Sequence, residues 1–283
     1  SAVTMPSIPF PDPVLLLQMT VLLAVIGALA GVIAGLLGVG GGIVLVPAFF
    51  YGFTALGYGG AQLMQLCLAT SLAMIIVTSA RSVAAHHAEG AVDWDILRGW
   101  APGIAVGAVA GVAAAAVLRS DTLVGIFGAL ALLVGLYLAV GRSEWRLGEA
   151  MPAGLRRLAL APGVGFLSVL MGIGGGSFGV PLMTLYGVAI HRAVATAAGF
   201  GMVIAVPSVA GFLLVELAPD SRPPGTVGAI NLPALLVVIA ATWMTAPLGA
   251  RLAHATDAGR LKRIFGVFLL LVAANMLRKA LGF

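Results

Sequence analysis

Two glycine-rich loops carry the residues best suited to binding chemistry in this chain. Residues 34–47 read Ala-Gly-Leu-Leu-Gly-Val-Gly-Gly-Gly-Ile-Val-Leu-Val-Pro, and residues 168–181 repeat the pattern as Ser-Val-Leu-Met-Gly-Ile-Gly-Gly-Gly-Ser-Phe-Gly-Val-Pro. Glycine breaks a continuous helix and lets the backbone approach a ligand closely. A helix that begins after such a break presents free N–H groups and a partial positive charge, which bind anions. The loops therefore predict anion binding at helix ends.

Polar side chains near the two loops extend the candidate site. Thr70 and Thr196 occupy matching Ala-Thr pairs and can supply hydroxyl donors, and Gln62 and Gln65 can supply amide donors. The alternative for each hydroxyl is a bond back to its own helix. The candidate substrate-binding residues are Gly38, Gly40, Gly41, Gly42, Gln65, Thr70, Ser71, Arg81, Gly172, Gly174, Gly175, Gly176, Ser177 and Thr196, with Pro47 and Pro181 as structural residues.

The positions of charged residues indicate the charge of the cargo. All 10 acidic residues fall at or beyond the ends of the apolar segments, so no span offers a carboxylate to a metal ion, a sodium ion or an organic cation. Arg81 is the basic residue closest to a span interior, where it either attracts an anion or snorkels to headgroups. His86 and His87 either couple protons or lie at the interface. The cargo is expected to be an anion, with no metal or cofactor.

The composition sets the class of protein that must position these residues. At 61% hydrophobic and 9% charged residues, the chain is too apolar for a soluble domain of its 283 residues. It is expected to be an all-α polytopic membrane protein. The net charge of +5 is explained by basic cytoplasmic loops, which excludes nucleic acid as a partner. The acids, histidines or metal ligands that a membrane enzyme would cluster within the bilayer are missing from the pattern, so an enzyme is not expected.

Apolar runs predict five segments in each half of the chain. They are 14–37, 43–57, 62–86, 96–118 and 122–141, and then 157–171, 177–190, 193–216, 230–250 and 260–281. The segments 157–171 and 177–190 fall short of the ~20 residues that cross a bilayer core, so we interpret them as half-helices meeting at the glycine break. The organisation is then an extended lead-in (1–13), a first repeat (14–141), a basic cytoplasmic linker (142–156) and a second repeat (157–283).

The basic loops predict how the repeats are oriented. If the Arg-rich loops 142–157 and 251–263 are cytoplasmic, the loop 217–229 and both termini lie outside. The loop 87–95, which corresponds to 217–229 in the first half, then lies inside. The two halves therefore have inverted topology, with either five crossings each or three crossings and a re-entrant pair. Glycines spaced by four (27, 31 and 35; 103, 107 and 111) predict close helix packing.

Glycine breaks at matching positions of two inverted halves are the sequence pointer to the midplane site of a secondary transporter. The motifs resemble those of the sulfite exporter TauE/SafE family of bacterial inner-membrane permeases. The resemblance is carried by the two glycine loops, by Ala69-Thr70-Ser71, by residues 90–93 (Gly-Ala-Val-Asp), by residues 246–251 (Ala-Pro-Leu-Gly-Ala-Arg) and by residues 264–266 (Ile-Phe-Gly). The chain departs from that pattern at 195–197, where Ala-Thr-Ala replaces Gly-Thr-Ser.

The resemblance implies transport of a small sulfur-containing anion, such as sulfite, thiosulfate or an organosulfonate like sulfoacetate, across the bacterial inner membrane. Together with the histidines it favours coupling to the proton gradient and alternating access. An anion channel of the same architecture and a carrier for a non-sulfur organic anion remain the alternatives. The sequence leaves open which anion is carried, in which direction, and whether the chain forms oligomers.

Overall fold

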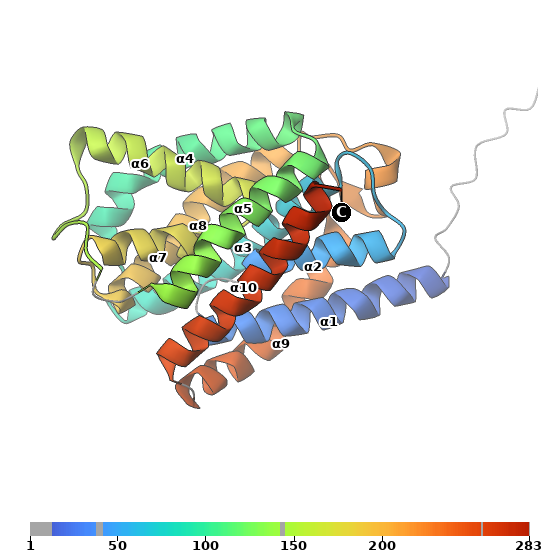
Figure 1. Ribbon diagram of the computed structural model, residues 1–283. Coiled ribbons are helices and arrows are strands. Elements are labelled where there is room, and N and C mark those ends of the chain that lie inside the picture. The colour runs from blue at the N-terminus through green and yellow to red at the C-terminus, as the bar shows by residue number, and fades with distance from the viewer. Residues whose placement is uncertain (1–12, 38–41, 142–144, 256, 283) are drawn as a thin grey trace, which may run out of the picture.

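The structure is a computed structural model that describes residues 13–37, 42–141, 145–255 and 257–282, and these residues are almost entirely helical (Figure 1). Each segment predicted from the sequence corresponds to one helix. The helices are α1 (Pro13–Leu37), α2 (Gly42–Ala55), α3 (Leu63–Ala88), α4 (Trp94–Val117), α5 (Ser120–Val140), α6 (Gly154–Leu170), α7 (Gly176–Leu185), α8 (Ile190–Phe212), α9 (Leu232–Ala255) and α10 (Ala258–Ala280).

Several helix boundaries differ from the predicted ones because apolar turns were included in the predicted helices. The segment 177–190 ends as α7 at Leu185, since a turn follows in which Gly187 has a φ of +84°. The segment 193–216 ends as α8 at Phe212. In the opposite sense, α6 begins at Gly154, within the residues predicted as linker, so that Arg156 and Arg157 belong to its first turn.

A short hairpin before α9 was not predicted. Strand β1 (Thr226–Val227) pairs antiparallel with β2 (Ile230–Asn231), and a 3-10 turn, η1 (Pro219–Ser221), precedes them. Gly228, with a φ of +57°, is the first of the two turn residues. Two-residue hairpin loops require positive φ at this position, which glycine adopts readily. The predicted segment 230–250 therefore begins as a strand and becomes helical only at Leu232.

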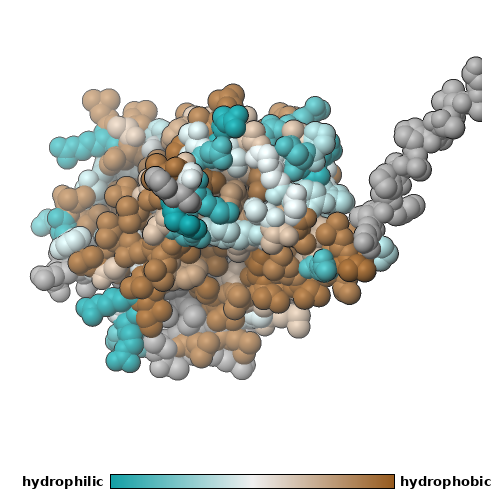
Figure 2. Space-filling model, turned by 45° about the vertical axis from the view of Figure 1, so that its right-hand side comes forward, coloured by the Kyte–Doolittle hydropathy of each residue, from teal (hydrophilic) through white to brown (hydrophobic). Residues whose placement is uncertain are grey.

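The surface of the helical bundle is that of a multi-pass membrane protein. Among the described residues, five helices are long and apolar enough to cross a membrane: α3, α4, α5, α8 and the described part of α1 up to Ile33. Large apolar side chains on these helices face outward, such as Val106, Val109 and Leu133. Figure 2 shows brown apolar side chains over much of the lower centre of this face, with hydrophilic residues in its upper centre and in patches at the edges.

Two opposite ends of the bundle can be defined by loop contacts (Figure 1). At one end, the Leu147 N–H donates to the carbonyl of Leu185, which joins the residues between α5 and α6 to the end of α7; we call this the linker side. At the other end, the Gly59 N–H donates to Asp220 and the Ser120 N–H to Ala61. The C-terminal end of α10 lies at this second end, which we call the terminal side.

Two of the helix pairs are hairpins rather than pairs of crossings. Helix α6 starts on the linker side, and α7 returns to that side, because its last residue contacts the linker. Helix α2 runs from its contact with residues 172–173 toward the loop on the terminal side, next to the N-terminal half of α1. Neither α6, with 17 residues, nor α7, with 10, is among the described helices long and apolar enough to cross a membrane.

Contacts between the halves come in corresponding pairs. Helix α1 packs along α9 and α6 along α4, while α3 packs on α8 and α5 on α10. The predicted glycine packing is confirmed, because Gly27 faces Val238 of α9 and Gly103 faces Ala161 of α6, each too closely for a side chain. Helix α3 is the most buried membrane-span candidate and lies at the centre, against α8.

Candidate functional site

The break between α6 and α7 is a defined turn. Helix α6 ends in a Schellman motif, in which the Ile173 N–H donates to Ser168 and the Gly172 N–H donates to Val169, both at 2.9 Å. Gly172 has a φ of +60°, and a side chain there would also meet Val46 and Leu68. Glycine is therefore required at this position by both backbone conformation and space. The prediction of a break at this loop is confirmed.

Helix α7 begins with an uncapped N-terminus that points away from the linker side. Gly175 is its N-cap residue, and no side chain caps it. The first N–H accepted within the helix is that of Gly179, which donates to the Gly175 carbonyl at 2.7 Å. The N–H groups of Gly176, Ser177 and Phe178 come before this bond, so they have no acceptor inside the helix. They provide donors and about half a positive charge at this point.

Three helices meet closely at Gly175. A Cβ atom there would collide with the Ala197 carbonyl oxygen and with Phe200 of α8. A Cβ atom at Gly201 of α8 would in turn collide with the Ser79 hydroxyl of α3. The start of α7 therefore lies directly against the crossing of the two central helices, and Gly175 lies at a helix break, as the sequence predicts.

A pocket of about 30 Å³ opens at this meeting point. This volume exceeds the ~10–15 Å³ that one water molecule needs, so it can hold the head of a small ligand. The lining residues come from the three helices and the break: Ile75, Thr78, Ser79 and Ser82 of α3, Gly174, Gly175 and Gly176 at the start of α7, and Val194, Ala197 and Ala198 of α8.

The three hydroxyl groups of α3 differ in how they are engaged. Thr78 donates back to its own helix, to the carbonyls of Met74 and Ile75 at 3.4 and 3.3 Å. Ser79 is only 8% exposed and has no hydrogen-bond partner among the described residues. Ser82 is half-buried and also has none there. The Ser79 oxygen is not among the fully buried polar atoms without a partner, so it can be reached from the pocket, and its unpartnered hydroxyl beside an uncapped helix end indicates a place for a ligand.

Some predicted site residues connect the two breaks instead of lining the pocket. The Ser71 hydroxyl donates to the Gly172 carbonyl at 2.7 Å. Gly42, the first residue of α2, packs against the Gly172 carbonyl and Ile173 so closely that no side chain would fit. Ser177 is buried in the first turn of α7, outside the pocket. Direct contacts of these residues with a substrate remain predictions.

Thr70 and Thr196 accept matching hydrogen bonds from the opposite half. The Thr70 hydroxyl oxygen accepts from the N–H of Asn231 at 3.1 Å, just before α9, and that of Thr196 accepts from the N–H of Asp93 at 2.9 Å, just before α4. Neither threonine lines the pocket. Their matching positions therefore have a structural use that their sequence positions alone did not reveal, and a role in substrate binding remains a prediction.

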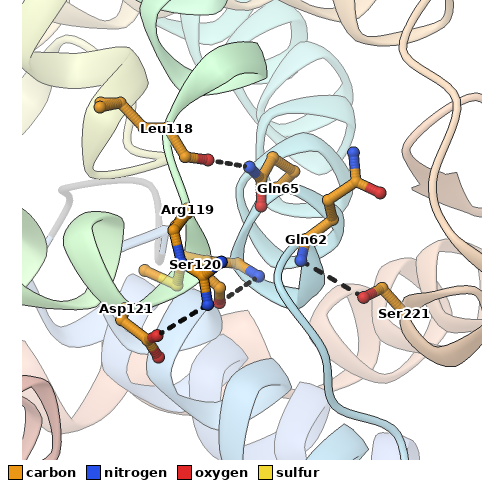
Figure 3. Close-up of polar contacts among 8 residues, drawn as sticks. Gln62, Gln65, Leu118, Arg119, Ser120, Asp121 and Ser221 are labelled. Carbon is orange, nitrogen blue, oxygen red and sulfur yellow. Dashed lines mark hydrogen bonds and ion pairs between the residues drawn. The ribbon is translucent and has the colours of Figure 1, made fainter.

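Gln65 lies on the terminal side, near the first turn of α3 (Figure 3). Its amide nitrogen donates to the carbonyls of Ala115 and Leu118 at 3.0 and 2.6 Å, which secures the end of α4. Its oxygen is buried without a partner among the described residues. Fourteen residues of α3 separate it from Ser79, or about 21 Å along the helix axis. Gln62, near Ser221, is likewise distant from the pocket.

The basic and histidine candidates lie beyond the pocket lining. The Arg81 guanidinium stacks over the ring of Trp243 in α9, 3.5 Å from its centroid, on an exposed face of α3. His87 accepts a hydrogen bond from the Trp94 indole at 3.3 Å, and His86 is half-buried one turn after Ser82. Anion attraction by Arg81 and proton coupling by the histidines remain predictions.

The remaining candidates are three loop glycines and two prolines. Gly38, Gly40 and Gly41 lie outside the described residues. Pro47 and Pro181 are inside α2 and α7, five residues after the first residue of each helix, so both helices continue past the proline. A proline in this position removes one helical donor and leaves a carbonyl without its partner.

Sequence reasoning missed Thr78, Ser79 and Ser82, although a signal for them exists. Polar groups within a span are costly and usually functional, and these three fall within a membrane-span candidate. The repeat gives no signal for Ser79, because it corresponds to an alanine, Ala205.

The described residues that line the pocket are suited to binding an anion. It offers N–H and hydroxyl donors, which suit an oxyanion. No group of three or more histidine, cysteine or acidic side chains that could hold a metal ion occurs among the described residues. Every acidic side chain in the described parts of the chain lies at a helix end or in a loop, such as Asp93, Asp121 and Glu149.

Comparison with known proteins agrees with this arrangement. The family model of the sulfite exporter TauE/SafE family matches residues 23–276. The chain belongs to this family. It is a membrane transporter protein of the TauE/SafE family, built from transmembrane helices.

Two relatives carry matching descriptions. A probable membrane transporter protein of Haemophilus influenzae (strain Rd) is 30% identical over 241 residues, which cover 85% of this chain and 91% of the relative. The probable membrane transporter protein YunE of Bacillus subtilis (strain 168) is 26% identical over 276 residues, covering 91% and 97% of the two chains. No solved structure matches this chain significantly.

Proposed function

We propose that this TauE/SafE protein is a secondary transporter that carries a small sulfur-containing anion, such as sulfite, thiosulfate or an organosulfonate like sulfoacetate, across the bacterial inner membrane. The anion binds with its oxygens toward the start of α7 and the hydroxyls of Ser79 and Ser82. Helix ends supply the attraction, so that no metal or cofactor is needed.

The observation that carries this proposal is the unpartnered hydroxyl of Ser79 beside the uncapped N-terminus of α7. Ser79 is only 8% exposed and lines the same pocket as Gly174, Gly175 and Gly176. Oxyanions satisfy several such donors at once. The family supplies the expectation of a sulfur oxyanion, and the geometry supplies the donors.

The packing of the two halves supports a carrier that works by alternating access. We propose that the halves are inverted repeats, since α1 packs along α9 as α6 packs along α4. The hairpin of α1 and α2 begins on the terminal side and that of α6 and α7 on the linker side. Inverted repeats place a site near the midplane, and rocking of one half against the other exposes it to each side in turn. In this proposal the linker side is cytoplasmic and both termini are outside.

Binding is tested by a thermal-shift screen of the purified protein against sulfite, thiosulfate, sulfoacetate, carboxylates and phosphate. Sulfur anions are expected to raise the unfolding temperature with concentration. Ser79→Ala should weaken their binding roughly tenfold to hundredfold, because a hydrogen bond to a charged ligand is lost. Ser168→Ala is the matched control, since the Ser168 hydroxyl is fully buried, has no partner among the described residues and lies outside the pocket. Stabilisation by choline or a polyamine instead would contradict the proposal.

Carrier and channel are distinguished by counterflow in proteoliposomes. A carrier loaded with unlabelled anion accumulates labelled anion transiently and saturates, whereas a channel does neither. The orientation of the two halves in the membrane is tested by reporter fusions at Ala150 and after Phe283. The two reporters are expected on opposite faces of the membrane.

Proton coupling through the histidines is tested separately. We expect a variant with His86→Ala and His87→Ala to bind the anion but to lose accumulation driven by a pH gradient. Unchanged accumulation in that variant would remove these histidines from the proposal and leave the anion site intact.

A further inference from the structure

The pocket at the start of α7 contains donors but no full charge. None of the described side chains that line it is ionisable; they are aliphatic, hydroxyl or glycine residues. Its positive potential comes from N–H groups at one helix end, equivalent to about half an elementary charge. Such a site can balance part of one negative charge.

The basic side chains nearest in the fold are engaged elsewhere. The Arg81 guanidinium stacks on Trp243. Arg192, two residues before Val194 on α8, forms an ion pair with Asp93 at 2.8 Å. Neither lines the pocket, and each has a partner that holds it away.

Two imidazoles lie one helical turn from lining residues, toward the linker side. His86 follows Ser82 by one turn of α3, and His191 precedes Val194 by one turn of α8, so each shares a helix face with a lining residue. Glu89 and Asp95 are exposed on the same side. The helix ends on the linker side thus carry both histidines and acids, while the described residues that line the pocket are uncharged.

We infer that this pocket selects a singly charged oxyanion and discriminates against a dianion of similar size. The inference rests on the proposed function and specifies the charge of its ligand. The cost of removing an ion from water rises with the square of its charge, so a dianion loses about four times as much hydration energy as a monoanion. Neutral donors and one helix end can offset the lost hydration energy of a single charge, but not that of two. The ligand class is a sulfonate, hydrogen sulfite or another small monoanion, which narrows the proposed cargo and ranks the dianions thiosulfate and sulfoacetate below it.

Methanesulfonate and sulfate separate the two cases, because they have similar heads and keep their charges of one and two across the neutral range. Binding to the purified full-length protein is measured by titration calorimetry at constant ionic strength. We expect methanesulfonate to bind at least ~10-fold more tightly than sulfate. Equal or tighter binding of sulfate would overturn the inference while leaving the proposed function standing. Failure of methanesulfonate, sulfite and sulfoacetate all to bind would overturn both.

A charge introduced at the lining tests the cause of the preference. Ser82 is half-buried, so a longer side chain can extend toward the mouth of the pocket. Ser82→Lys is expected to reduce the preference for methanesulfonate by about tenfold, since an ammonium group balances the second charge. Ser82→Met, of similar length but uncharged, should keep the wild-type ratio. The same ratio in both variants would show that charge balance does not set the selectivity.

The two imidazoles provide the last control. A variant with His86→Gln and His191→Gln is expected to keep the preference between the two anions, even if both bind more weakly. Loss of the preference in that variant would assign the selectivity to the histidines and overturn the inference.

Discussion

The two threonine contacts between the halves share one geometry but differ in chemistry. In the Asn231 junction, Thr70 receives the N–H of Asn231, whose side chain accepts from the Ala234 N–H and donates to Pro224 and Thr226. In the Asp93 junction, Thr196 receives the N–H of Asp93, whose carboxylate accepts from the Ile96 N–H and pairs with Arg192. In both, the residue before a helix is its cap and is held by a threonine of the other half.

Burial separates the two junctions. Asn231 is fully buried on the terminal side, with every side-chain polar atom engaged by neutral groups. The Asp93 side chain is 19% exposed and that of Arg192 57%, on the linker side. A buried neutral network is costly to open, whereas a solvent-exposed ion pair contributes little. We therefore expect the two corresponding contacts to differ in strength, with the linker-side contact opening more readily.

Exchanging the cap residue of the buried junction is expected to have the largest effect. Asn231→Asp places a carboxylate against the Pro224 carbonyl, where the amide nitrogen had donated at 3.1 Å. We expect a loss of about 3 kcal/mol or more of folding stability, because a buried charge is left facing an acceptor. The midpoint of thermal unfolding in detergent measures it. A wild-type midpoint would show that the junction is open to water.

Removing each threonine hydroxyl compares the junctions directly. Thr70→Val and Thr196→Val each leave one N–H without its acceptor, at a cost of about 1–3 kcal/mol. Both threonines are fully buried, but only the Asp93 cap borders solvent, so the larger loss is expected for Thr70→Val. Thr→Ser at the same positions should restore most of the stability. Equal losses would contradict the ranking of the two junctions.

Neutralising the exposed junction is expected to have the smallest effect. Asp93→Asn keeps the acceptor for the Ile96 N–H and loses only the ion pair with Arg192, worth about 0–1 kcal/mol at such an exposed position. Arg192→Gln should behave alike, and high salt should reduce the difference from wild type. A loss in Asp93→Asn that exceeds the one in Asn231→Asp would reverse the comparison.

The helices and the second glycine break followed from the sequence for physical reasons. Apolar runs in a membrane must be helical, since their backbone groups have no other partners, so all ten segments were correctly predicted as helices. The break was predictable because Gly172 and Gly175 occupy positions that admit no side chain. The ends of α7 and α8 were harder, because turns in contact with a membrane protein's apolar surroundings are themselves apolar, as at Leu213 and Val188.

The composition of the candidate site was only partly predictable. Gly174, Gly175 and Gly176 line one pocket, and their contact with a substrate stays a prediction. Ser79 and Ser82 were missed because they reach the pocket through the crossing of α3 and α8, a tertiary contact that no local pattern encodes. Gln65 is the opposite case, because it was predicted to bind substrate but its amide donates to the Leu118 carbonyl at the end of α4.

The central claim is that an anion occupies the pocket where α3, α7 and α8 meet, and a thiol placed at its lining tests it most directly. The chain has a single cysteine, Cys67, and it is fully buried, so Ser82→Cys adds an accessible thiol to an unreactive background. The rate of its alkylation is measured with increasing methanesulfonate, which does not react with the alkylating reagent, alongside Ala150→Cys in the exposed linker. The account predicts that the rate at position 82 falls in proportion to anion occupancy while the rate at position 150 stays constant. An unchanged rate at position 82 under conditions where the anion stabilises the protein would show that the anion binds elsewhere.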